Sequence, residues 1–306
     1  MTRARWWVAL LLPLALAPSC SEPTAAPDGA RALERVKQQV AFGPRIPGSP
    51  GHEKFRAWLV TELERLGARI ERQSFVDTLA GQAYPMENVI ARFGPRDGRP
   101  IALFAHYDTR PWCDQDPDPA KRTEPVAGAN DAGSGVAVLL EVAELLKQRA
   151  PSVGVDLVFL DGEDLGRPAH PDEYCRGSQH YASVLPPQGE AARPVAGFVF
   201  DMVGDADLGI WDEGNSAARA TNLVALVHEA ARATGARHFH EGVRHTLIDD
   251  HIALLDAGLP AVDIIDFDYA AWHTTADLPD RVSAESLAEV ARVAAWIVYQ
   301  SPLAKR

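Results

Sequence analysis

Two adjacent acids, Glu163 and Asp164, follow the run Val-Asp-Leu-Val-Phe-Leu at residues 155–160, with only Asp161 and Gly162 between. Neighbouring carboxylates repel each other unless a cation or a shared proton relieves them. One carboxylate can then ligate a metal ion while the other moves protons to and from a substrate held there. A Glu-Asp pair by itself is more often a solvated turn. In the turn that follows an apolar strand, however, the pair indicates a catalytic metal site.

Other metal-competent side chains also follow apolar runs. His106 and Asp201 each come directly after such a run, and His273 lies in the loop after a third. In open α/β sheets, ligands bind outside the carboxyl ends of the strands. Acids and histidines that merely covered the surface would be spread over both strand ends. Their concentration at one kind of strand end therefore predicts a site.

Asp131 stands in the segment Gly-Ala-Asn-Asp-Ala-Gly-Ser-Gly at residues 128–135, just before a predicted helix. Small residues allow a tight backbone turn, from which the carboxylate can project into a pocket. The alternative is that Asp131 only caps a helix that begins near Ser134. Because the other acids and histidines point to one site, we favour a metal ligand.

Zinc binds imidazole nitrogen and carboxylate oxygen, and catalytic zinc sites keep one coordination position open. The candidate ligands are Asp131, Asp164 and His273. Two interpretations remain for His106. It would hold a second metal together with Asp201 and a bridging Asp131, or it would orient neighbouring groups through hydrogen bonds.

The elements that must position these residues alternate between apolar strands and amphipathic helices. Helical patterns cover residues 30–41, 51–66, 135–149, 221–234, 251–257 and 283–299. Strand-like runs cover residues 70–75, 88–93, 101–105, 155–160, 198–200 and 261–265. Nearly continuous apolar strands separated by helices predict a sheet that is covered on both faces. The first strands have no helix between them, so we expect an antiparallel part. The predicted fold class is α/β: a three-layer α/β/α sandwich with a mixed, largely parallel central sheet.

The composition is that of a globular protein, with 46% hydrophobic residues among 306. There are 42 acidic and 30 basic residues, which give a formal net charge of −12. Nucleic-acid-binding proteins normally carry a basic surface, so no nucleic-acid partner is expected.

The N-terminal residues have the pattern of an export signal. Arg3 and Arg5 precede an apolar run at residues 6–17, which is shorter than the roughly 20 residues that span a bilayer. Cys20 follows as in a bacterial lipobox, with ordinary signal-peptidase cleavage as the alternative. We expect a signal peptide at 1–20, a tether at 21–29 and one catalytic domain at 30–306. The protein would be exported, either periplasmic or a lipoprotein that meets the membrane only through its lipid.

Two cysteines remain in the predicted mature chain, Cys113 and Cys175. In an oxidising compartment such a pair can form a disulfide. Two buried free thiols are the alternative, and the spacing in the sequence does not decide between them.

Several segments together resemble the zinc-dependent M28-type aminopeptidase superfamily, in the same order along the chain. They are His-Tyr-Asp-Thr-Arg-Pro (106–111), Gly-Ala-Asn-Asp (128–131), Asp-Gly-Glu-Asp (161–164) and Asp-Met-Val-Gly (201–204). Asp-Asp-His (249–251) and Trp-His-Thr (272–274) are similar to the glutaminyl cyclase branch, in its bacterial form related to the animal enzyme. The similarity extends over roughly residues 43–299.

The resemblance implies a role for each matching residue. It implies one zinc ion per chain, on Asp131, Asp164 and His273. Glu163 would be the general acid/base, in a hydrogen-bonded carboxylate network with Asp201 and Asp249. The pocket walls would be Trp272 and Tyr174, the latter standing where bacterial relatives have tryptophan.

The implied reaction converts an N-terminal glutamine of a peptide or protein to pyroglutamate and releases ammonia. Zinc would polarise the γ-carbonyl, and Glu163 would carry a proton from the α-amine to the leaving ammonia. We expect a monomer with no organic cofactor. The main alternative is a two-metal aminopeptidase in which Glu163 activates water. Trp272 and the Asp-Asp-His segment favour the cyclase, and the presence of Glu163 and all ligands argues against an inactive binding lipoprotein.

Overall fold

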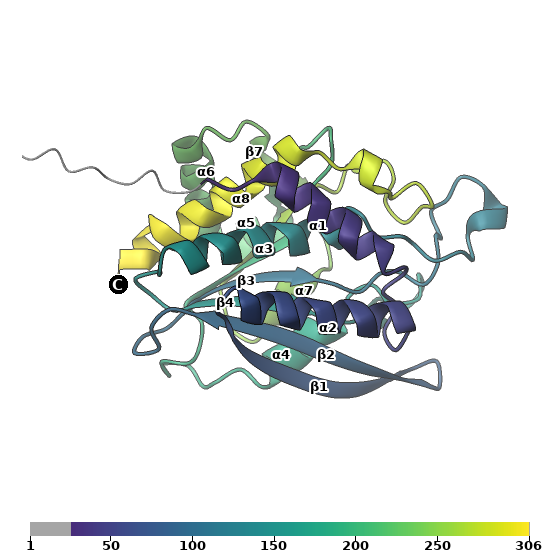
Figure 1. Cartoon of the computed structure of the whole chain (residues 1–306), viewed down its shortest axis with the longest axis horizontal. Coiled ribbons are helices and arrows are strands. Elements are labelled where there is room, and N and C mark those ends of the chain that lie inside the picture. Colours follow the sequence, from purple (N-terminus) through teal and green to yellow (C-terminus); the bar gives the residue numbers. More distant parts are fainter. Residues whose placement is uncertain (1–25, 306) are drawn as a thin grey trace, which may run out of the picture.

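Six strands form the central sheet of the structure, a computed structural model in which residues 26–305 are described (Figure 1). Their order across the sheet is β1-β2-β4-β3-β5-β8. Their bounds are β1 Arg69–Leu79, β2 Gln82–Phe93, β3 Ile101–His106, β4 Val155–Leu160, β5 Ala196–Asp201 and β8 Ala261–Ile265. β1 pairs with β2, and β2 with β4, in antiparallel fashion, while β4, β3, β5 and β8 are mutually parallel. The predicted mixed sheet with an antiparallel part is confirmed.

Helices cover both faces of this sheet. On one face lie α1 Gly29–Ala41, α2 Pro50–Arg65, α3 Gly133–Gln148, α6 Thr221–Thr234 and α8 Ala284–Tyr299. On the other face lie α4 Arg176–Ser183 and α7 Asp250–Asp256, which contact each other and the strands. The predicted three-layer sandwich is therefore confirmed, with helix boundaries close to those expected from periodicity.

The sequence analysis did not predict α4, and three further elements lie outside the sequence prediction. β6 Ile210–Glu213 and β7 Phe239–His245 form a separate two-stranded parallel sheet, and α5 Gly214–Arg219 joins β6 to α6. β7 is largely polar and partly exposed, while β6 and α5 are very short. None of the three repeats apolar residues often enough to give a periodic signal.

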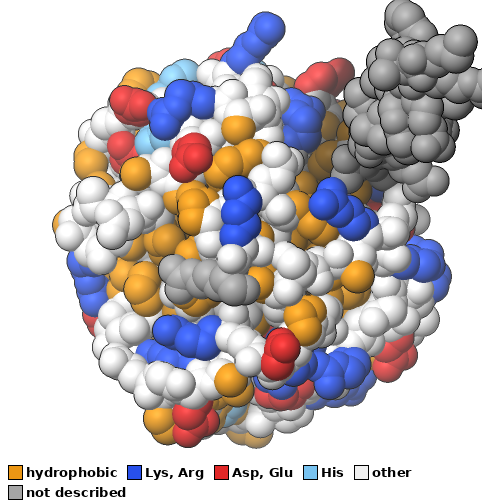
Figure 2. Space-filling view, turned by 90° about the vertical axis from the view of Figure 1, so that its left-hand side faces the viewer, with side chains coloured by type: hydrophobic (Ala, Val, Ile, Leu, Met, Phe, Trp, Pro, Cys, Tyr) orange, Lys and Arg blue, Asp and Glu red, His pale blue; other side chains and the backbone are white. Residues whose placement is uncertain are grey.

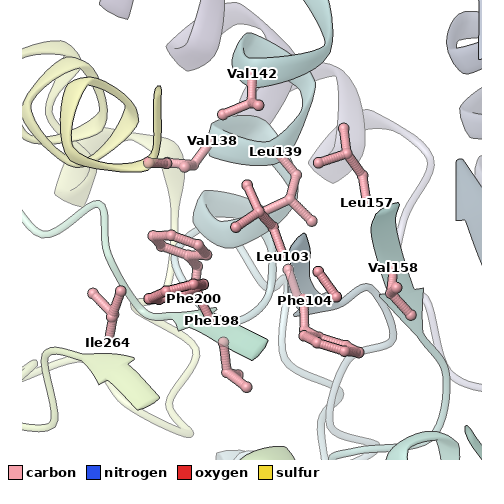
Figure 3. Close-up of a cluster of buried hydrophobic side chains, with 14 of the residues drawn as sticks. Leu103, Phe104, Val138, Leu139, Val142, Leu157, Val158, Phe198, Phe200 and Ile264 are labelled. Carbon is pink, nitrogen blue, oxygen red and sulfur yellow. The ribbon is translucent and has the colours of Figure 1, made fainter. Parts of the chain in front are cut away.

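The core explains why the strands read as continuous apolar runs. Successive side chains of a strand point to opposite faces. From β3, Leu103 lies toward Val138 and Leu139 of α3 (Figure 3), whereas Phe104 packs edge-on against Tyr181 of α4 with ring centroids 5.2 Å apart. Because helices cover both faces, both sets of side chains are buried.

The described chain begins at one end of the molecule. Ala26 and Pro27 lie in a hollow formed with α8 and the last turn of α3, beside Arg149 and Tyr299. Figure 2 shows this side, on the left in Figure 1, where apolar side chains gather among scattered charged ones. No candidate for a membrane-spanning segment is found among the helices of residues 26–305. The carboxyl ends of the four parallel strands lie at the opposite end, where the candidate site residues gather.

Candidate metal centre and active site

Asp131, Asp164 and His273 converge from three distant parts of the chain. Asp131 precedes α3, Asp164 follows β4 and His273 lies in the loop after β8. All three are buried, and their potential ligand atoms lie within 4.8 Å of one another. His273 Nε2 is 3.3 Å from Asp164 Oδ1 and 3.7 Å from Asp131 Oδ2. We call these three residues the ligand cluster.

The ligand cluster fits a zinc ion in its chemistry and in its unsatisfied groups. Two carboxylates and one imidazole are a donor set that zinc takes. Asp164 Oδ2 is buried and has no hydrogen-bond partner among the described residues. A buried polar atom without a partner is costly, so a cation at this position would relieve that cost.

Asp131 does not cap α3. The helix begins at Gly133, and its N-cap residue Ala132 makes no side-chain hydrogen bond. Asp131 is instead held through its backbone, because the amides of Asn130 and Asp131 donate to the two oxygens of Asp277 at 2.8 and 3.3 Å. Burial, with the nearby Asp131 carboxylate, raises the pKa of Asp277 to about 7.

Asp108 fixes the turn that presents Glu163 and Asp164. Its two carboxylate oxygens accept hydrogen bonds from the backbone amides of Glu163 at 3.0 Å and Asp164 at 3.2 Å. Both acids of the pair are thereby aimed by a third acid from a neighbouring strand end. Sequence analysis did not foresee this function, although Asp108 stands in the His-Tyr-Asp segment that follows β3.

Glu163 lies beside the ligand cluster, and 14% of its side-chain surface remains exposed. Burial raises its pKa well above the usual value; His106 opposes this, while Asp164 and Asp249 add to it. Cys175 Sγ donates to Glu163 Oε1 at 3.5 Å. A carboxyl group with a raised pKa beside a metal site suits general acid/base work.

His106 is surrounded by acids. Its Nε2 lies 3.2 Å from both Asp131 Oδ1 and Asp201 Oδ1, and its Nδ1 lies 3.5 Å from Asp108 Oδ1. Burial opposes its charge, but hydrogen bonds to these three acids outweigh burial and hold the pKa of His106 well above its usual value. His106, Asp131 and Asp201 also form a second group whose potential ligand atoms lie within 4.8 Å. The geometry is compatible with both interpretations of His106.

Asp201 and Asp249 are the two acids predicted to form a network with Glu163. Asp201 ends β5 beside His106, and Asp249 caps α7 with its carboxylate within 4.8 Å of Glu163. Two carboxyl groups can form a hydrogen bond to each other only if one of them carries a proton. Burial raises the pKa of Asp201 to about 7, with His106 opposing. This raised pKa is consistent with the predicted carboxylate network, which remains a prediction.

A pocket of about 270 Å³ opens over these acids. Trp272 and Tyr174, the two residues predicted to wall a substrate pocket, both line it, and Leu247, Ile248 and Phe267 add apolar wall that sequence analysis missed. Trp272 stacks on His273, with ring centroids 3.9 Å apart, and packs against Phe267 at 4.9 Å. The aromatic wall is thus in direct contact with a candidate metal ligand.

A second group of buried titratable residues includes Asp249. We call Asp249, Asp250, His251 and Asp263 the inner cluster. His251 Nε2 lies 2.9 Å from Glu213 Oε2, and His251 Nδ1 lies 3.6 Å from Asp263 Oδ2. Both carboxylate oxygens of Asp250 and of Asp263 are buried without a hydrogen-bond partner among the described residues. His251, whose function the sequence left open, is therefore a buried partner of acids.

Cys113 and Cys175 are both buried free thiols, so the structure contains no disulfide between them. Burial raises the pKa of both thiols, that of Cys113 to about 11. Of the two alternatives that the sequence left open, the structure has the reduced one.

Comparison with known proteins agrees with this geometry. The sequence profile of "Peptidase family M28" matches residues 88–298, more than half of the chain. The chain belongs to peptidase family M28. The resemblance seen in the sequence motifs is thereby confirmed.

Solved structures and curated relatives of this M28 protein include cyclases and an exopeptidase. It is 36% identical to a glutaminyl cyclase from Fimbriiglobus ruber, with a TM-score of 0.85 and coverage of 91% of this chain and 97% of the other. It is 33% identical to a zinc-dependent exopeptidase from Parabacteroides distasonis, with a TM-score of 0.86 and coverage of 91% and 100%. A "glutaminyl-peptide cyclotransferase-like protein" from Bos taurus is 25% identical over 276 residues, which are 82% of this chain and 70% of the relative.

Proposed function

We propose that this M28 protein is a glutaminyl-peptide cyclotransferase, which converts the N-terminal glutamine of peptides or proteins to pyroglutamate and releases ammonia. The observation that carries the proposal is the position of Glu163. It adjoins the ligand cluster at the floor of a pocket walled by Trp272 and Tyr174. The similarity to glutaminyl cyclases over nine-tenths of the chain supports the same activity.

One zinc ion per chain would be held by Asp131, Asp164 and His273. When bound, it supplies Lewis-acid polarisation of the glutamine γ-carbonyl. The residues of the pocket provide the remaining requirements of the reaction.

Glu163 accepts a proton from the substrate α-amine and returns it to the departing ammonia. The amine nitrogen forms a bond to the γ-carboxamide carbon, and the bond from that carbon to the amide nitrogen breaks. Because the five-membered ring closes within one molecule, the reacting atoms are already close. Asp201 and Asp249 orient Glu163 and share its proton. Asp249 lies within 4.8 Å of Glu163, whereas Asp201 reaches it through His106, which lies 3.2 Å from Asp201 and 4.0 Å from Glu163.

The apolar wall keeps water from competing with the amine. Trp272, Phe267 and Leu247 present hydrophobic surface to the pocket, and Tyr174 closes it from the side of the loop before α4. A substrate amide between these side chains would meet few water molecules, so cyclisation would be favoured over hydrolysis.

A two-metal aminopeptidase is the second candidate, and one observation favours it. His106, Asp131 and Asp201 form a further group of potential ligands, with Asp131 common to both groups. In that reaction Glu163 would activate a water molecule to attack a peptide bond. The solved relative described as an exopeptidase is consistent with this alternative.

Two substrates and a metal count distinguish the candidates. Purified protein is incubated with a peptide that begins with glutamine and, separately, with an aminoacyl anilide, and the zinc content per chain is measured. We expect ammonia and a pyroglutamyl peptide from the first, no reaction with the second, and one zinc. Release of a free amino acid with two zinc ions would establish the peptidase instead.

We further propose that the protein is exported and works as a monomer outside the cytoplasm. The leader at 1–20 lies outside the described residues, as does the tether up to residue 25. The arginines, the apolar run and Cys20 support the leader and its lipidation. Cys20→Ser should release the protein from membranes, and unchanged membrane fractionation would contradict a lipid anchor.

A further inference from the structure

Arg110 is a buried cation that has no function so far as a metal ligand or as the acid/base. Its side chain has no exposed surface, yet the guanidinium makes hydrogen bonds in three directions. Nη1 donates to Asp164 Oδ1 at 3.0 Å and to the Gly166 carbonyl at 3.1 Å. Nε and Nη2 donate to Asp114 Oδ1 at 2.7 Å and Oδ2 at 3.1 Å, which is a bidentate pair.

Asp114 extends this contact to a second candidate ligand. Its Oδ1 lies 3.2 Å from His273 Nδ1. A carboxylate at Nδ1 keeps the proton on that nitrogen and leaves Nε2 free to bind a metal. Arg110 therefore reaches Asp164 directly and His273 through Asp114.

The third direction leads to the pocket wall. Nη2 of Arg110 donates to the Tyr174 hydroxyl at 2.9 Å, and the guanidinium lies over the Tyr174 ring, 5.3 Å from its centroid. The ring packs so closely on Gly166 that a Cβ there would lie 2.1 Å from it. The loop around Gly166 and the Tyr174 ring are thus fixed by the guanidinium that also holds the ligands.

We propose that Arg110 and Asp114 are positioning residues that couple metal binding to the shape of the substrate pocket. The planar guanidinium donates hydrogen bonds to Asp114, Asp164 and Tyr174 at the same time. A lysine ammonium carries the same charge but is a single point donor and cannot reproduce this fork. The coupling thus depends on geometry more than on charge. The proposal has a metal half, which is the support of the zinc ligands, and a pocket half, which is the placement of Tyr174. The pocket half rests on the proposed function, whereas the metal half does not.

Zinc affinity tests the metal half without any substrate. It is measured on the full protein by competition with a chromophoric chelator. Loss of a residue that supports a metal ligand typically costs about 10- to 100-fold in affinity. We expect a loss of that size for Arg110→Lys and for Asp114→Asn. The matched control is Arg96→Lys, because Arg96 also pairs with a buried acid, Asp156, but at the other end of β4; its zinc affinity should equal that of the wild type.

Tyr174→Phe tests the pocket half, since it keeps the ring over which the guanidinium lies and removes only the hydroxyl that accepts a hydrogen bond from Arg110. We expect unchanged zinc affinity and a several-fold higher KM for a glutamine-initiated peptide, with little change in kcat. Wild-type zinc affinity in both Arg110→Lys and Asp114→Asn would overturn the proposal, as would an unchanged KM in Tyr174→Phe. If Arg110→Lys does not fold, as judged by circular dichroism, Asp114→Asn decides the metal half. Weaker zinc binding in a protein that forms no pyroglutamate from any peptide would refute the proposed function while leaving the metal coupling intact.

Discussion

The ligand cluster and the inner cluster both bury acids at the same edge of the sheet, but they differ in what balances their charge. In the ligand cluster, the Arg110 guanidinium lies 3.0 Å from Asp164. In the inner cluster, no arginine or lysine forms a salt bridge with Asp249, Asp250 or Asp263 in residues 26–305. His251 is the basic side chain that lies beside Asp263, and it also contacts Glu213.

The difference indicates two ways of keeping carboxylates inside a protein. Buried acids without a cation become tolerable when they keep protons, and burial raises the pKa of Asp250 and Asp263 well above the usual value. The ligand cluster is distinguished by the Arg110 guanidinium and not by its donor set, because Asp249, His251 and Asp263 also bring two carboxylates and one imidazole within 4.8 Å of one another. Glu163 lies between the two clusters and is in electrostatic contact with both. A group in that position can exchange a proton with one side while the substrate is held on the other.

The largest effect is expected from Glu163→Gln, which removes the group between the clusters and keeps its shape. Positioned acid/base groups contribute about 10²- to 10⁴-fold to rate. We expect kcat for a glutamine-initiated peptide to fall within that range while the zinc content stays at the wild-type value. Near-normal turnover would show that the acid/base lies elsewhere.

Removal of zinc should destabilise the protein through the ligand cluster alone. A ligand that binds only the folded state at 1,000 times its Kd stabilises it by about 4 kcal/mol. The thermal midpoint should therefore fall on dialysis against a chelator and recover when zinc is restored. Asp263→Asn should show the same zinc-dependent change, because the inner cluster is not expected to bind the ion.

Two matched substitutions separate the clusters by metal affinity. Asp164→Asn removes a ligand, so it should weaken zinc binding by more than the roughly 100-fold upper limit for a supporting residue. Asp263→Asn makes the same chemical change in the inner cluster and should leave the affinity unchanged. Equal losses in a chelator competition would mean that the two clusters act as one metal site.

The smallest effect concerns pH. Because the folded-state pKa of Asp263 is raised, the folded protein binds a proton that the unfolded chain has already released. This stabilisation is complete below the ordinary pKa of an aspartate, near 4, and is lost as the pH rises toward the folded-state pKa. Each such proton gives a slope of about 1.4 kcal/mol per pH unit in the free energy of unfolding.

Urea unfolding of the wild type and of Asp263→Asn between pH 5 and 8 measures this slope, with the chelator present in both. The variant should lose stability less steeply as the pH rises. Identical slopes would mean that Asp263 is already ionised in the folded protein.

The sequence predicted much of this site because strand ends are visible in it. Apolar runs locate the strands, and the residues that follow them meet at one edge of a parallel sheet. Asp164 and His273, 109 residues apart, were assigned to one ion on that basis. The supporting residues carry no such mark. Arg110 and Asp277 bond to groups 54 and 147 residues away, and an arginine or aspartate in a loop looks like any other until the chain is folded.

The fold shows the same limit. Strands buried on both faces were found, whereas β7 was missed because its polar, partly exposed side chains give neither a continuous nor an alternating apolar pattern. The two cysteines are a further case, because spacing along the chain does not state whether two thiols can meet.

The place where the polypeptide enters the fold sets how the molecule would be oriented at a bilayer. Ala26 and Pro27 lie against the last turns of α3 and α8. The pocket is lined by residues that follow the carboxyl ends of the parallel strands, which lie at the other end of the sheet (Figure 1). A protein tethered by residues upstream of Ala26 would have its anchored end toward the lipid headgroups and its pocket toward the aqueous space. Peptide termini could then approach from solution without first passing the membrane surface.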